Sequence, residues 1–189
     1  SFSGYMAAQK GSSERMTIRA ARTVGKDRRP VQINGGRKVT RREAREHCFK
    51  MLFCQDFYPA EEKEEQLERY FEAPKEDVTG EDGKDEILHD PFEKEEDRYY
   101  LEKRVEKIME LIPEIDEKIN EIAEGWRTRR MGKVELTILR LAVFEMKYDE
   151  EIPEKVAINE AVELAKKFGG DEAPAFVNGI LAKLIQKGN

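Results

Sequence analysis

Apolar residues in the last third of the chain recur at the spacing of an amphipathic helix. Between residues 132 and 149 they stand three and four positions apart, at Val134, Ile138, Leu141, Ala142 and Met146. A helix with about 3.6 residues per turn places such residues on one face. Val143 and Phe144 widen that face, which predicts a central helix. No segment alternates apolar and polar residues as a half-buried strand would. We therefore predict an all-α fold.

The same spacing predicts six further helices. They cover about residues 40–57, 61–72, 94–112, 114–125, 153–168 and 172 onward. Pro113 separates two of them, because proline interrupts a helix but is well placed in the first turn of the next. Residues 73–93 contain Gly, Pro and many acids, and we predict a solvated loop there.

Charge is distributed unevenly along the chain. Residues 1–46 hold 12 Lys/Arg and 4 Asp/Glu, a net charge of +8, so a total of −6 leaves −14 for the rest. Residues 1–37 also mix Gly, Ser and Pro without an apolar period, which predicts a disordered basic arm before a helical domain over 38–189. A basic arm on an acidic body is typical of polyanion binding, although a solubilising tail has the same composition.

Several classes of protein are disfavoured by what the sequence lacks. It has no run of about 18 apolar residues and no apolar signal-peptide core, which predicts a cytoplasmic protein without a membrane span. Cys48 and Cys54 are too far apart for a C-x-x-C motif, and His47 and His89 lie in unlike segments. We therefore predict reduced thiols, no metal and no cofactor. No nucleophile–base pair or paired carboxylates can be identified, so we predict no enzyme activity.

The stretch "VTRREAREHCF" combines a helix start with an unusual choice of charge. Thr40 and Glu43 match a capping box, yet Arg41, Arg42 and Arg45 crowd the first turns. Cations at a helix N-terminus cost about 0.3–1 kcal/mol each when exposed. A phosphate would supply the missing countercharge and would also accept hydrogen bonds from the backbone. The alternative is a solvated or salt-bridged surface, with Glu46 placed to pair with Arg42.

Three blocks towards the C-terminus carry a resemblance to a known family. "KVELTILRLAVFEM", "IPEKVAINEAVELAKKFGG" and "FVNGILAKL" resemble the NusB family of bacterial transcription antitermination factors, and "RREARE" fits the same family. The resemblance implies a seven-helix, all-α fold of two packed helical subdomains without enzyme activity. It further implies binding of boxA-type RNA together with NusE, a small-subunit ribosomal protein, and indirect contact with other Nus factors and RNA polymerase. Some relatives form dimers, so a homodimer stays open.

The resemblance also assigns candidate site residues. Its arginine-rich helix start falls on Arg41, Arg42 and Arg45, with Arg37 and Lys38 of the arm beside them; Glu43 stands where the family is often basic. Its second RNA contact falls on Glu172 and Phe176, with Ala175 where a lysine is common. For the NusE surface it implies Phe53 and Glu135.

Each assignment has a structural alternative. Phe176 has the spacing of a core residue, Glu135 suits the first turn of a helix, and Gly179 suggests close helix packing. The function also has alternatives. NusB-like domains occur at the N-terminus of certain ribosomal RNA cytosine methyltransferases, and a purely protein-binding helical module would have a similar pattern.

Overall fold

The computed structural model describes residues 40–72, 76–79, 85–89 and 95–187. These residues form six α-helices: α2 (Arg41–Gln55), α3 (Lys63–Glu72), α4 (Glu95–Ile122), α5 (Lys133–Tyr148), α6 (Glu154–Phe168) and α7 (Ala173–Lys187). Short 3₁₀ turns precede α3 and α5, namely η2 (Ala60–Glu62) and η3 (Thr128–Arg130). Two strands, β1 (Glu76–Thr79) and β2 (Asp85–His89), lie between α3 and α4. Residues 1–37, predicted as a basic arm, and the site candidates Arg37 and Lys38 lie outside the described residues.

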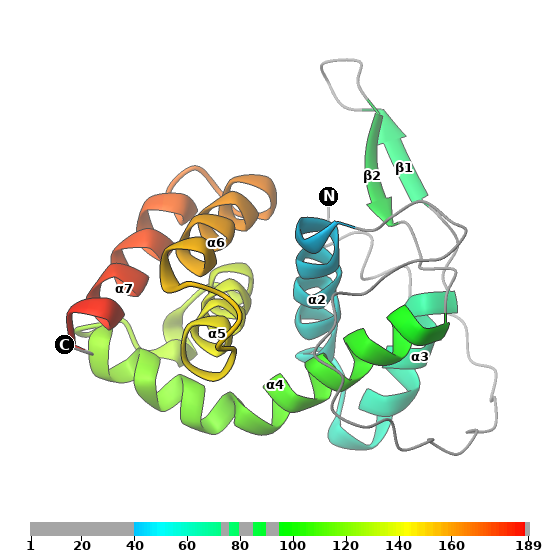
Figure 1. Ribbon diagram of the computed structural model, residues 1–189, viewed down its shortest axis with the longest axis horizontal. Coiled ribbons are helices and arrows are strands. Elements are labelled where there is room, and N and C mark those ends of the chain that lie inside the picture. The colour runs from blue at the N-terminus through cyan, green and yellow to red at the C-terminus, as the bar shows by residue number, and fades with distance from the viewer. Residues whose placement is uncertain (1–39, 73–75, 80–84, 90–94, 188–189) are drawn as a thin grey trace.

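The long helix α4 connects two groups of helices. Figure 1 shows α2 and α3 against its first half and α5 and α7 against its second half, while α6 packs on α5 and α7. The predicted central helix is confirmed, because α5 packs against α2, α4, α6 and α7. Ten of its residues are buried, and one continuous apolar core runs through both groups. Among the described residues, no helix is both long and apolar enough to cross a bilayer.

A guanidinium group also holds three helices together. Arg140 on α5 donates two hydrogen bonds of 2.8 Å to the carboxylate of Asp116 on α4. It also lies 3.3 Å from the carboxylate of Asp56, the residue that follows α2. Charge-assisted, two-pronged contacts of this kind fix relative orientation as well as distance. Arg140 therefore links α5 to α4 and to the end of α2.

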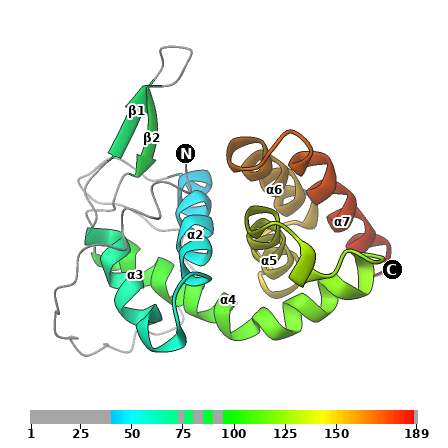
Figure 2. The same ribbon diagram turned by 180° about the vertical axis from the view of Figure 1, so that it is seen from behind.

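The prediction of two helices around Pro113 was wrong, because α4 is a single helix of 28 residues. Proline removes one backbone donor and costs a helix about 3 kcal/mol. The helical turns on both sides of Pro113 are anchored in the core, because Ile108, Ile115 and Ile119 are fully buried. Each such side chain contributes about 1.5–3 kcal/mol on burial. The helix therefore continues through the proline, and α4 follows a curve beneath its neighbours in Figures 1 and 2.

The predicted loop over residues 73–93 contains a short antiparallel hairpin instead. Glu76 pairs with His89 and Val78 with Glu86, with an irregularity between Glu76 and Asp77. Figure 1 shows this hairpin projecting from the helical body. Its sequence has no alternating apolar face, which is why the pattern contained no strand signal. The packed core is helical, so the all-α prediction is confirmed for the body of the fold.

The expected close packing at Gly179 was wrong. Gly179 is exposed on α7, and a Cβ atom there would meet nothing within 4 Å. Gly125 also has open space around it, but its φ of +96° lies in the left-handed region. Both glycines therefore have space for a side chain, and they differ only in backbone conformation.

We predict opposite effects on stability from alanine at these two glycines. Gly179→Ala should raise the free energy of unfolding by about 0.5–1 kcal/mol, because alanine is the better helix former. Gly125→Ala should lower it by about 1–2 kcal/mol, because an L side chain is strained in the left-handed region. Urea unfolding followed by circular dichroism measures both. A destabilised Gly179→Ala variant would mean that something covers this face of α7.

Both cysteines should react slowly in the native protein. Burial raises the pKa of the Cys48 and Cys54 thiols from 9.0 to about 12, and a thiol reacts as its thiolate. At about pH 8, a thiol reagent should therefore label neither residue quickly, whereas both should react at once in denaturant. Rapid labelling of the folded chain would show that α2 opens readily.

Candidate RNA-binding and partner surfaces

The helix start predicted at Thr40 is confirmed in atomic detail. The Glu43 backbone N–H donates to Thr40 Oγ1 at 3.1 Å, and the Thr40 backbone N–H donates to Glu43 Oε2 at 2.8 Å. This is the reciprocal capping box, which satisfies two donors that a helix start leaves unpaired. It also explains the acid at Glu43, where the resemblance leads us to expect a basic residue.

Arg45 points inward from α2 and is held by two carboxylates. Its Nε lies 2.8 Å from Glu145 Oε1 and 3.1 Å from Oε2, and its Nη1 lies 3.5 Å from Glu160 Oε2. The side chains of Arg45 and Glu145 are only 10% and 2% exposed. Arg45 therefore joins α2 to α5 and α6 within the protein, and its countercharge is already supplied.

Arg42 lies at the surface but is also paired. Its Nη2 and Nε donate to the two carboxylate oxygens of Glu160 at 2.9 and 3.1 Å, while its side chain stays 60% exposed. The hydrogen bonds to Glu160, and then its charge, raise the pKa of Arg42 above its ordinary value. The alternative pairing of Arg42 with Glu46 was wrong, because Glu46 accepts from Lys167 at 2.9 Å.

Arg41 differs from the other two arginines. It is exposed, and it has no hydrogen-bond or ion-pair partner among the described residues. It occupies the first position of α2, beside the backbone N–H groups of the helix start. The three arginines are therefore not equivalent. Arg41 is available to bind an anion, Arg42 becomes available once its ion pair with Glu160 opens, and Arg45 has a structural role.

A shallow groove of about 290 Å³ separates α2 from α6 beside these arginines. Its walls carry both signs of charge, from Arg42, Arg45, Glu46, Glu160, Glu163, Lys166 and Lys167. Lys166 donates to Glu163 at 2.8 Å, so much of this charge is neutralised locally. The groove itself is therefore a weak anion site, and of the three arginines only Arg41, at the exposed start of α2, keeps a charge without a partner among the described residues.

The second predicted RNA site lies at the turn between α6 and α7. Gly169 ends α6, and a Cβ atom there would come within 2.5 Å of the Ala173 Cβ, so the tight turn requires glycine. Glu172 is exposed just before α7. Phe176 is half-buried; its ring packs on the core and meets the ring of Trp126 edge to face, 6.1 Å away. Phe176 is therefore both a core-packing residue and a partly accessible ring.

The predicted NusE-contact residues have unequal access to solvent. Phe53 is 3% exposed and packs against Phe57, whose ring lies 5.1 Å away and is 46% exposed. Glu135 is half-buried in the first turn of α5, which also agrees with its alternative as a dipole-favoured acid. Sequence reasoning missed Phe57, the exposed aromatic side chain next to Phe53.

Sequence reasoning also missed the turn between α4 and α5. Trp126 in this turn is 60% exposed. It is followed by Arg127, Arg129 and Arg130, all exposed. The stretch "WRTRR" could have indicated a basic, aromatic turn, but an analysis of helical periodicity does not consider residues in turns. No group of three or more His, Cys, Asp or Glu side chains in the described residues is placed to bind a metal ion.

Comparison with known proteins identifies the family of this chain. The NusB family model matches residues 42–186. The chain belongs to the NusB family. A transcription antitermination protein NusB from Lachnoclostridium phytofermentans is 48% identical over 147 residues, covering 78% of this chain and 99% of the relative. The resemblance drawn from the three sequence blocks is thus confirmed.

Solved NusB structures share the fold. A structure of T. maritima NusB is 29% identical with a TM-score of 0.63, covering 79% of this chain and 93% of that one. A crystal structure of the antitermination factors NusB and NusE in complex with dsRNA is 25% identical with a TM-score of 0.56, covering 78% and 96%. The NusB-type helical arrangement is therefore common to all three.

We predict that Arg45 is chiefly a structural residue in this NusB protein. Arg45→Ala would remove the cation that hydrogen-bonds the buried carboxylate of Glu145, and loss of one partner of a buried ion pair typically costs about 3–5 kcal/mol of folding free energy. Arg42→Ala should have a much smaller effect, because that pair is solvent-exposed. Guanidinium unfolding curves of both variants measure the difference. Similar curves for Arg45→Ala and the unsubstituted chain would show that Glu145 finds another partner.

Proposed function

We propose that this chain is a transcription antitermination factor that binds single-stranded, boxA-type RNA together with a NusE-type ribosomal protein. Its family membership and the antitermination role named for its 48% identical relative support this function. The related NusB–NusE structure, which includes RNA, supports both kinds of partner. Other Nus factors and RNA polymerase would be engaged indirectly, in the bacterial cytoplasm, to let transcription of ribosomal RNA pass terminators.

The main observation in favour of RNA binding is the Arg41 guanidinium at the start of α2, which has no partner within the part of the chain that the structure describes. A phosphate beside Arg41 would meet a full positive charge, the positive end of the helix dipole and backbone donors. Arg42 can add a second contact once Glu160 releases it, at the cost of an exposed ion pair. Phosphate contacts position RNA without reading its sequence. Sequence choice therefore requires bases stacked on rings, and Phe176 with Glu172 is the proposed place for one base.

The NusE-type partner is proposed to dock beside Phe57, with Phe53 supporting that ring from below and Glu135 near the edge of the contact. Aromatic rings half open to solvent are characteristic anchors of protein interfaces. Homodimer formation through an overlapping surface is a separate proposal, and size measurement with and without the partner would decide it.

We propose no catalytic role. The alternative as a methyltransferase fragment is not favoured, because the antitermination relative is matched over 99% of its own length. A purely protein-binding module is the remaining alternative. It shares the NusE surface with the main proposal and differs only in lacking salt-dependent RNA binding.

The test is a fluorescence-anisotropy titration of labelled boxA-type RNA, with and without the NusE-type partner. The unsubstituted chain should bind, and binding should weaken as salt rises. Replacing Arg41 and Arg42 by alanine should weaken binding and reduce the salt slope by about 0.7 for each phosphate that the variant no longer neutralises. Arg45 is left intact, because its removal would confound binding with folding.

The matched control replaces Lys103 and Lys107 by alanine, an equal reduction of charge on the exposed face of α4. Circular dichroism checks that both variants remain folded. If neither the chain nor its complex with the partner binds RNA, the protein-binding module replaces this proposal. If only the control variant binds RNA more weakly, the RNA lies on α4 and not at the start of α2.

A further inference from the structure

The turn between α4 and α5, residues 123–132, presents an aromatic ring and three guanidinium groups to solvent. Trp126 is 60% exposed, and Arg127, Arg129 and Arg130 are exposed with it. None of these three arginine side chains has a hydrogen-bond or ion-pair partner among the described residues. Unpaired arginines beside an exposed tryptophan are unusual on a surface where most basic side chains are paired, as Lys103, Lys147 and Lys166 are.

The turn is held in one conformation. Glu124 and Gly125 adopt positive φ angles of 42° and 96°, which turn the chain away from α4 just before Trp126. The Thr128 backbone N–H then donates to Asn120 Oδ1 at 2.9 Å, and Thr128 itself is buried. The exposed side chains are therefore presented by a fixed backbone, which lowers the entropy cost of binding.

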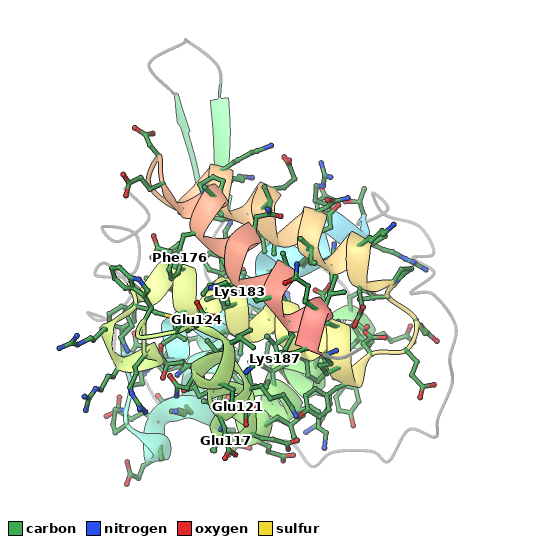
Figure 3. All side chains as sticks on the ribbon, turned by 90° about the vertical axis from the view of Figure 1, so that its left-hand side faces the viewer. Glu117, Glu121, Glu124, Phe176, Lys183 and Lys187 are labelled. Atoms are coloured by element: carbon green, nitrogen blue, oxygen red, sulfur yellow. The ribbon has the colours of Figure 1, made fainter. Side chains whose placement is uncertain are left out.

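Helix α7 fixes this turn beside Phe176. Lys183 on α7 donates to Glu124 at 3.0 Å, and Lys187 donates to the backbone carbonyl of Glu121 at 2.9 Å. Figure 3 shows Lys183 and Glu124 close together below Phe176 on this side of the molecule. The edge-to-face contact between Trp126 and Phe176 places two rings next to each other. Trp126 thus continues the aromatic surface that Phe176 begins.

The charge of the turn contrasts with that of the rest of the body. The turn, residues 123–132, holds Arg127, Arg129, Arg130 and one acid, Glu124, a net charge of 3 − 1 = +2. Residues 47–189 together carry −14, so the remainder of that span carries −16. A local positive patch on an acidic protein attracts a polyanion to one place and repels it elsewhere.

We infer that the α4–α5 turn is a second RNA-binding element, in which Trp126 stacks on a base and Arg127, Arg129 and Arg130 contact the phosphates that flank it. This inference rests on the proposed RNA-binding function and extends the RNA path beyond Phe176. Single-stranded RNA fits this surface best, because its unpaired bases have open faces for a ring and its phosphates follow at regular spacing. An acidic protein segment would match the arginines but would leave the tryptophan without a specific role.

The test uses the full chain with the NusE-type partner and labelled single-stranded boxA-type RNA. Replacing Arg127, Arg129 and Arg130 by alanine should weaken binding and reduce the salt slope by about 2, because each neutralised phosphate accounts for about 0.7 of it. Trp126→Ala should weaken binding by about fivefold to a hundredfold with little change in salt slope, and Trp126→Phe should restore most of the affinity. A variant with alanine at Lys103, Lys107 and Lys155 is the control for removal of three exposed charges.

The single tryptophan of the chain offers a direct second readout. Bound RNA should quench Trp126 fluorescence and shield the ring from acrylamide. If the unsubstituted chain shows no RNA binding, the proposed function itself fails. If RNA binds and Arg41→Ala/Arg42→Ala weakens it, while the turn variants match the control and Trp126 remains accessible, this inference alone is overturned. If the turn variants fail to bind the partner in the absence of RNA, the inference is also overturned, in favour of a protein interface.

Discussion

The arrangement of the helices depends on a buried ion pair between α2 and α5. Arg45 and Glu145 are 100 residues apart in sequence and are 10% and 2% exposed. A pair so deeply desolvated is stable only with good geometry and additional hydrogen bonds. Arg45 Nε donates to both carboxylate oxygens of Glu145, and Glu160 adds a second ion pair. The position of α2, and with it the place where its N-terminus meets solvent, follows from this contact.

The same contact resolves the unusual charge of the helix start. Three arginines near a positive helix end need compensation, and the fold provides it for two of them, through Glu145 for Arg45 and Glu160 for Arg42. Of these three arginines, Arg41 alone has no partner within the described residues. The proposed RNA site is therefore smaller at α2 than three arginines suggest. The α4–α5 turn, with its own unpaired arginines, would make up the difference in positive charge.

Much of the fold could be predicted from sequence, because helices depend on local periodicity. The apolar spacing in the segment of α5 predicted that this helix is buried, and the capping-box pattern of Thr40 and Glu43 predicted the start of α2. The errors came where tertiary packing outweighs a local rule. Buried isoleucines carry α4 through Pro113, and a charged segment without an apolar face still pairs as β1 and β2. Helical periodicity also gives no information on the exposure of residues in turns, so it did not indicate that Trp126 is exposed.

Residue order specifies which segments form helices, where α2 is capped and to which family the chain belongs, because these depend on neighbours within a few positions or on ordered motifs. The availability of each arginine depends instead on the packed fold, because the carboxylates that neutralise Arg42 and Arg45 come from helices about a hundred residues away. Packing also leaves Phe53 covered and Phe57 exposed, and it brings Trp126 beside Phe176. Burial and pairing are properties of distant contacts, and local sequence patterns do not specify them.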